Sequence, residues 1–186
     1  MISLARPPAA ELVRFLDAQR ALPFTYEAVG HTRDEQTPRG YAIDHNRVRL
    51  GSGAQTFTSA QAQVRAWRMF PPWTAIAPLA TPIEEGRVLA VLVNAFGVWF
   101  KNAARIVYVI DEPGRFGFAY GTLPGHAERG EERFLVEHLA DDSVWYDVRA
   151  FSQPRYWGAR LAYPITRMLQ KRFGRDSKAS MLRALR

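Results

Sequence analysis

Apolar residues alternate with a period of two through most of the chain from Trp73 onward. Runs rich in Val, Ile, Phe, Tyr and Trp occur at 73–77, 87–95, 97–101, 103–111, 115–122, 129–139 and 143–151. Gly, Pro or Asp residues separate these runs, so the pattern predicts a series of β-strands. The connections at 112–114 and 140–142 are short hairpin turns, which favour antiparallel pairing of the strands beside them.

Two helices and one further strand are predicted before this region. Residues 9–20 carry apolar side chains along one side, and a second helix runs from Thr58 or Ser59 to about Met69. Between the two helices, a short extended piece and a polar loop lead into a strand at 41–50.

A long helix is predicted near the C-terminus. Ser152 can cap its first turn, where Pro154 is tolerated. Steps of three and four residues place the apolar side chains of this segment on one face: Trp157, Leu161, Ile165 and Met168. Pro164 should kink the helix near Leu161. Gly174 is the expected stop, followed by a frayed basic tail at 175–186.

Helices grouped at the two ends of an antiparallel meander predict an α+β fold rather than a parallel α/β sheet. A curved sheet of about six to seven strands would wrap around the long C-terminal helix, which is the helix-grip plan. A cavity can remain where sheet and helix do not fully meet. The 186 residues fit a single domain, with 1–21 as an N-terminal helical extension, 22–174 as the helix-grip unit and 175–186 as the tail.

Composition excludes several kinds of site. The chain has no cysteine, which rules out disulfides and Cys-ligated metals. The histidines (His31, His45, His126 and His138) lack the spacing of metal ligands on a helix, so no metal site is predicted. No other cofactor is predicted. We expect a cytoplasmic protein, because the sequence contains no apolar run long enough for a membrane span and its start lacks the apolar core of a secretory signal.

The net charge of +7 is concentrated at the C-terminus. Residues 154–186 hold nine Lys or Arg against one acid, whereas the remainder is about neutral. Arg160, Arg167 and Lys171 fall on one stripe of the predicted helix. A solvated helix face is the simplest interpretation, and peripheral contact with anionic lipid or nucleic acid is the alternative. No specific nucleic-acid partner is predicted, and the oligomeric state stays open.

Five segments together resemble one protein family. They are Tyr41–Gly53, Arg105–Glu112, Phe116–Phe134, Val144–Asp147 and Ala150–Pro154. As a set they are similar to the DUF1990 family, also called UPF0548, over roughly 22–176. The family has no assigned function. Its resemblance to START or Bet v 1-like domains implies a helix-grip fold with a pocket for an apolar or amphipathic small molecule.

Potentially reactive side chains gather where two predicted strands turn, between Phe116 and Phe134. Strand alternation places Tyr120 and Glu132 on the inner face and Glu131 on the opposite face, pointing outward. The predicted pocket lining comprises Phe116, Phe118, Tyr120, Thr122, Glu132, Phe134 and Tyr146 from the sheet, with Trp157, Leu161 and Ile165 from the helix.

Glu132, His126 and Tyr120 are candidates for acid–base chemistry. A carboxylate on an apolar wall has a raised pKa and can donate or accept a proton near neutral pH. His126 can reach over the same mouth from its turn. The simpler interpretation of Glu132 is a salt bridge to Arg105 or Arg133. On that view His126 only hydrogen-bonds within its loop, and Tyr120 is a core ring.

Three functions remain open. The first is non-catalytic binding of a hydrophobic or amphipathic small molecule in the cavity, which we rank above catalysis. The second is an enzyme that uses Glu132 or His126, with Tyr120 or Tyr146, for proton transfer to a carbonyl compound. The third is a basic-helix protein that docks on a membrane, a nucleic acid or an acidic partner.

Overall fold

The structure is a computed structural model that describes residues 2–78, 81–155 and 163–186. Its elements in chain order are β1 (Ile2–Ser3), α1 (Ala9–Asp17), β2 (Ala42–Ser52), α2 (Ala54–Arg65), β3 (Thr74–Ala77), β4 (Val88–Ala95), β5 (Val98–Glu112), β6 (Arg115–Thr122), β7 (Glu128–His138), β8 (Ser143–Pro154) and α4 (Tyr163–Ala184).

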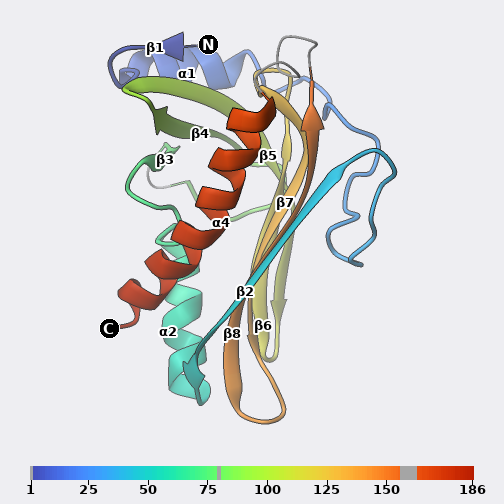
Figure 1. Ribbon diagram of the computed structural model, residues 1–186, viewed down its shortest axis with the longest axis vertical. Coiled ribbons are helices and arrows are strands. Elements are labelled where there is room, and N and C mark those ends of the chain that lie inside the picture. The colour runs from blue at the N-terminus through green and yellow to red at the C-terminus, as the bar shows by residue number, and fades with distance from the viewer. Residues whose placement is uncertain (1, 79–80, 156–162) are drawn as a thin grey trace.

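One antiparallel sheet organises the molecule. Its strand order is β2-β8-β7-β6-β5-β4-β3, and β1 adds a short pairing to β5. The sheet curves around α4, and α2 lies beside the C-terminal half of that helix (Figure 1). This arrangement confirms the α+β helix-grip fold that the sequence predicts.

Aromatic rings fill the interior at one end of the sheet. The largest are fully buried: Phe116 and Phe118 of β6, Phe134 of β7 and Tyr146 of β8. They form one cluster with Val64 of α2 and Met181 of α4. The Trp67 ring, just after α2, meets Phe118 edge-on with 4.9 Å between centroids. This end is therefore solid core, because the inward residues of the sheet meet both helices there.

The outer face of the sheet is covered as well, by the segment 22–40. The Tyr26 hydroxyl donates to the Glu131 carboxylate at 2.8 Å. The backbone N–H groups of Gly30 and Thr32 donate to the same carboxylate at 2.7 and 3.0 Å. Glu131 is consequently only 3% exposed. Glu131 thus lies on the outer face to which alternation assigns it, but a non-periodic loop covers that face, so its carboxylate is buried.

Two helix starts differ from those that the sequence predicts. Ser152 does not cap a helix, because it pairs with Ala42 of β2 and Gly130 of β7, and β8 continues beyond it. The second helix begins at Ala54, one turn earlier than the predicted start at Thr58.

The predicted runs at 97–101 and 103–111 form the single strand β5. Asn102, which lies between them, stays in the ladder opposite Val91 of β4. Its polar side chain interrupts the apolar pattern without interrupting the strand, since the Asn102 side-chain amide donates to the Val91 carbonyl at 3.3 Å.

The C-terminal helix does not stop at Gly174. A Cβ at this position would lie 2.4 Å from the Asn46 amide nitrogen of β2, so the glycine permits close approach of helix and sheet. The helix continues with Met181 fully buried, and the frayed basic tail expected after Gly174 is therefore wrong. Pro164 lies in the first turn of the described helix. The kink expected near Leu161 falls outside the described residues.

Candidate functional site

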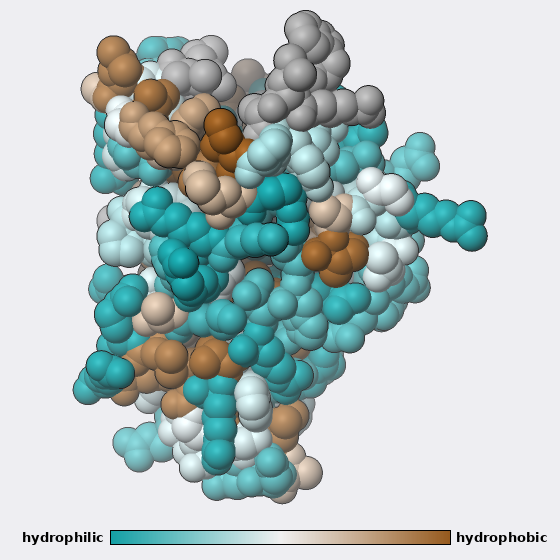
Figure 2. Space-filling view, in the orientation of Figure 1, coloured by the Kyte–Doolittle hydropathy of each residue, from teal (hydrophilic) through white to brown (hydrophobic). Residues whose placement is uncertain are grey.

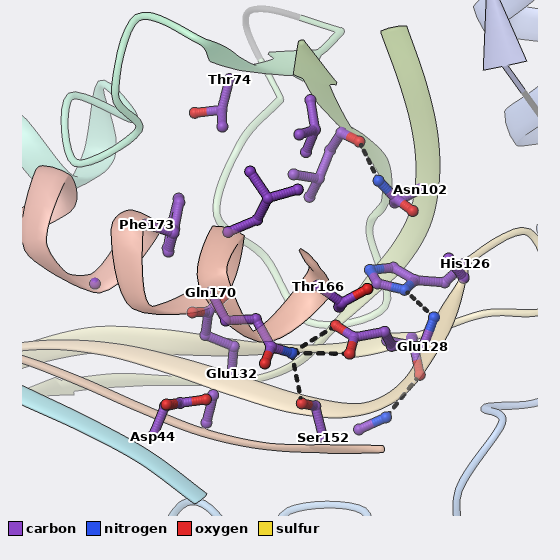
Figure 3. Close-up of a pocket in the computed structure, with 18 of the residues that line it drawn as sticks. Asp44, Thr74, Asn102, His126, Glu128, Glu132, Ser152, Thr166, Gln170 and Phe173 are labelled. Atoms are coloured by element: carbon purple, nitrogen blue, oxygen red, sulfur yellow. Dashed lines mark hydrogen bonds between the residues drawn. The ribbon is translucent and has the colours of Figure 1, made fainter. Parts of the chain in front are cut away.

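A pocket of about 510 Å³ lies between the curved sheet and the first half of α4 (Figure 3). Its walls are mostly apolar. They include Val91, Val93 and Ala95 of β4, Val148 and Ala150 of β8, and Leu169 and Phe173 of α4. Figure 2 shows hydrophobic residues gathered near the β4–β5 turn, where the exposed Phe96 also lines the pocket.

The size of the inward side chains explains where the pocket lies. The inward-facing residues of three strands become smaller from the packed end of the sheet toward the pocket. In that direction they are Phe116, Phe118, Tyr120 and Thr122 in β6, Phe134, Glu132 and Gly130 in β7, and Tyr146, Val148 and Ala150 in β8. Three adjacent strands thus pass from large rings to small residues, which leaves space under α4. The sequence contained this signal, but alternation alone records only which face a residue occupies.

The predicted lining separates into two groups. Tyr120, Thr122, Glu132, Ile165 and His126 line the pocket. Phe116, Phe118, Phe134 and Tyr146 do not, because they fill the packed core at the other end of the sheet. Trp157 and Leu161 lie outside the described residues.

Glu132 is the central polar group of the site. The Tyr120 hydroxyl donates to Glu132 Oε2 at 2.5 Å. The salt bridges considered from the sequence are absent among the described residues. Arg105 instead binds main-chain carbonyls around Arg20, and Arg133 binds Asp147 at 3.0 Å on the outer face. Without a cationic hydrogen-bond partner there, Glu132 is a carboxyl group on a largely apolar wall.

Burial raises the pKa of Glu132 to about 7, and the nearby charges of Asp44 and Glu128 act in the same direction. The Tyr120 hydrogen bond opposes this by favouring the ionised form. The carboxyl group is therefore close to half-protonated at neutral pH. Such a group can both donate and accept a proton.

A second polar group lies at the pocket edge and was not predicted. The Gln170 side-chain amide of α4 donates to both oxygens of Glu128 at 2.8 and 2.7 Å, and to Ser152 at 2.8 Å. Arg167 donates to Asp44 at 2.8 Å. These bonds join the helix to three strands. The sequence does contain a signal for Glu128, because it has the same strand phase as Glu132 and so faces the same side of β7.

His126 stands in the turn before β7. Its Nδ1 accepts the Glu128 backbone N–H at 3.0 Å, which confirms the hydrogen bond within the loop. Burial lowers the His126 pKa to about 4, so the ring is neutral at pH 7. Because Nδ1 accepts, the proton resides on Nε2. The ring can therefore offer one N–H donor.

The described residues hold no group of three or more His, Asp or Glu side chains arranged to bind a metal ion. Among the same residues, no helix is long and apolar enough to cross a membrane. The chemistry available is thus a carboxyl, a tyrosine hydroxyl and a neutral imidazole around a mainly apolar space.

These features define a helix-grip protein with a pocket under its C-terminal helix. The family model DUF1990, described as a domain of unknown function, matches residues 25–180, and the chain belongs to this family. A UPF0548 protein from Deinococcus radiodurans is 36% identical over 97% of this chain and 98% of its own length. One from Dictyostelium discoideum is 32% identical over 100% and 96%.

Two solved structures share the fold. A hypothetical protein from Helicobacter pylori aligns with a TM-score of 0.57 and 12% identity, over 88% of this chain and 99% of that one. The Zhui aromatase/cyclase from Streptomyces sp. R1128 aligns with a TM-score of 0.57 and 14% identity, over 78% and 93%. At such low identity the likeness concerns the fold alone.

Proposed function

We propose that this protein binds a hydrophobic or amphipathic small molecule in the pocket between the sheet and α4. The observation that carries the proposal is the 510 Å³ space with mostly apolar walls. Pockets of this size and lining are typical of small-molecule sites, where a few polar groups fix the orientation of the ligand.

The polar groups of the pocket favour binding over catalysis. Most of them are already hydrogen-bonded to other protein groups. Gln170 donates to Glu128, Arg167 donates to Asp44, and the Glu128 backbone N–H donates to His126. Groups arranged in this way are fixed in position and can orient a ligand. Catalysis would instead require several of them to turn toward one reacting atom.

Filling the pocket is expected to abolish binding. Ala150 lines it, and Ala150→Trp would place an indole in the space. Ala140→Trp, in the exposed β7–β8 turn, is the matched control. Native mass spectrometry of protein purified from its own source should find a retained small molecule in wild type and Ala140→Trp. We expect at least a tenfold lower occupancy in Ala150→Trp. Equal occupancy in all three proteins would contradict the proposal, and so would an empty wild-type pocket.

A second candidate is an acid–base enzyme acting on a carbonyl compound in the same pocket. The observation that favours it is the Glu132 carboxyl, with a pKa of about 7, beside the Tyr120 hydroxyl. Glu132→Gln separates the two candidates, because an enzyme would lose turnover while retaining its ligand. The basic-helix hypothesis stays a prediction. Arg167 is engaged with Asp44, and Arg160 lies outside the described residues.

A further inference from the structure

Among the residues that the structure describes, the charged side chains lining the pocket are all acidic. The lining residues that the structure describes include four acids and neither lysine nor arginine: Asp44, Glu128, Glu131 and Glu132. His126, which also lines it, is neutral because burial lowers its pKa to about 4. The chain as a whole carries a net charge of +7. The charged residues of the pocket lining are therefore opposite in sign to the net charge of the protein.

Two of these four acids are satisfied elsewhere. Asp44 forms an ion pair with Arg167. The Glu131 carboxylate is turned to the outer face, where Tyr26 and Thr32 donate to it. Neither has the capacity to neutralise a charged ligand.

The other two acids have neutral hydrogen-bond donors. Glu128 accepts only from the Gln170 amide, and Glu132 only from the Tyr120 hydroxyl, among the described side chains. One oxygen of Glu132, Oε1, has no such donor. Burial raises the pKa of Glu128, and the nearby charge of Arg167 offsets this only in part. The hydrogen bonds of Arg167 go to Asp44 and Gln170.

Burial raises the pKa of both Glu128 and Glu132, so ionisation of either is costly in the empty pocket. A cation placed between them would remove that cost. Aromatic rings also line the space, including Phe96, Phe100 and Phe173, and ring faces attract cations as well as apolar groups. Acids with neutral donors and aromatic walls thus favour the same kind of ligand.

We propose that the pocket selects an amphipathic organic cation, whose ammonium group contacts Glu128 and Glu132 while its apolar body packs against β4, β8 and α4. This inference rests on the proposed function and specifies its ligand class. A neutral or anionic head group would leave the two buried carboxyls without a compensating charge.

Matched amphipaths with a ten-carbon chain can test the inference. Decylamine, decanol and decanoate would compete with the neutral dye Nile red at pH 8, with fluorescence as the readout. We expect decylamine to displace the dye at a concentration at least about tenfold lower than decanol, because a charge-assisted hydrogen bond replaces a neutral one. Decanoate should be the weakest competitor.

The preference for decylamine should depend on pH through the ionisation of Glu132. The titratable and charged groups around Glu132 are Tyr120 of β6, Tyr146 of β8, Asp44 of β2 with its partner Arg167 of α4, and Glu128 of β7. Decylamine stays protonated between pH 6 and 8, since an alkylamine resembles the lysine side chain. Decylamine should bind roughly tenfold more tightly at pH 8 than at pH 6, because Glu132 ionises over that interval.

Variants connect the preference to the two carboxyls. Glu132→Gln and the double variant with Glu128→Gln should lose most of the preference for decylamine while still binding Nile red. Glu137→Gln, on the opposite face of the same strand, should retain it. Equal displacement by all three competitors, stronger displacement by decanoate, or a tenfold preference that survives in the double variant would overturn the inference and leave the proposed function standing. A pocket that binds neither dye nor competitor would overturn both.

Discussion

Replacing Glu131 by alanine is expected to lower the free energy of unfolding by about 3–5 kcal/mol. The carboxylate accepts hydrogen bonds from the Tyr26 hydroxyl, from the backbone of Gly30 and from both the backbone and the hydroxyl of Thr32. The Tyr26 hydroxyl and the Thr32 N–H would lose their partner in a buried place, where each unsatisfied group costs about 1–3 kcal/mol. Urea denaturation followed by tryptophan fluorescence measures the loss.

Glu137→Ala provides a matched control on the same strand and the same face. Glu137 is paired with Arg47 and Arg115 near the surface, so its loss should cost less than about 1 kcal/mol. If Glu131→Ala were no more destabilising than Glu137→Ala, the segment 22–40 would not be held by this carboxylate.

Two adjacent glutamates of β7 therefore have different structural roles. Glu131 binds the segment 22–40 to the outer face of the sheet through hydrogen bonds, and Glu132 faces the pocket. Their separation follows from the two-residue period of a strand. A shift of one residue in the β7 register would exchange them, so the hydrogen bonds to Glu131 also fix the orientation of Glu132.

Strand phase was the most reliable information in the sequence. It placed Tyr120, Thr122 and Glu132 on one face, and all three line the pocket. It also placed Tyr146 inward, where its hydroxyl meets Ser177 of α4 at 2.8 Å. These predictions hold because alternation is a local geometric property of a strand, independent of what packs against it.

What the sequence could not supply depends on contacts distant along the chain. The burial of Glu131 requires the loop 22–40, which has no periodic pattern. The helix continues through Gly174, where the missing side chain lets Asn46 of β2 approach it, although glycine is a common stop. The carboxyl groups of Asp44 and Glu128 are far apart in the sequence. They influence each other electrostatically because β2 pairs with β8, the last strand.

Glu132→Gln is expected to stabilise the protein at pH 8 by about 2–3 kcal/mol relative to wild type, and to have little effect at pH 5. The folded pKa of Glu132 is about 7, above the ordinary value of 4.5 for an unfolded chain. Between these values the folded protein retains a proton that the unfolded chain has released. The contribution of this carboxyl to stability is thus present in full below about pH 4.5, and it is lost as the pH rises through 7.

Glutamine cannot ionise, yet its side-chain oxygen can still accept the hydrogen bond from Tyr120. Every other titrating group is common to both proteins, so the difference between their unfolding free energies isolates Glu132. Urea titrations at pH 5 and pH 8 measure that difference, and carbon-13 NMR of the glutamate carboxyls follows the titration directly. A difference that does not change between the two pH values would show that Glu132 ionises in the folded protein as it does in the unfolded chain. The pH dependence expected for decylamine binding between pH 6 and pH 8 would then disappear as well, because Glu132 would be ionised at both values.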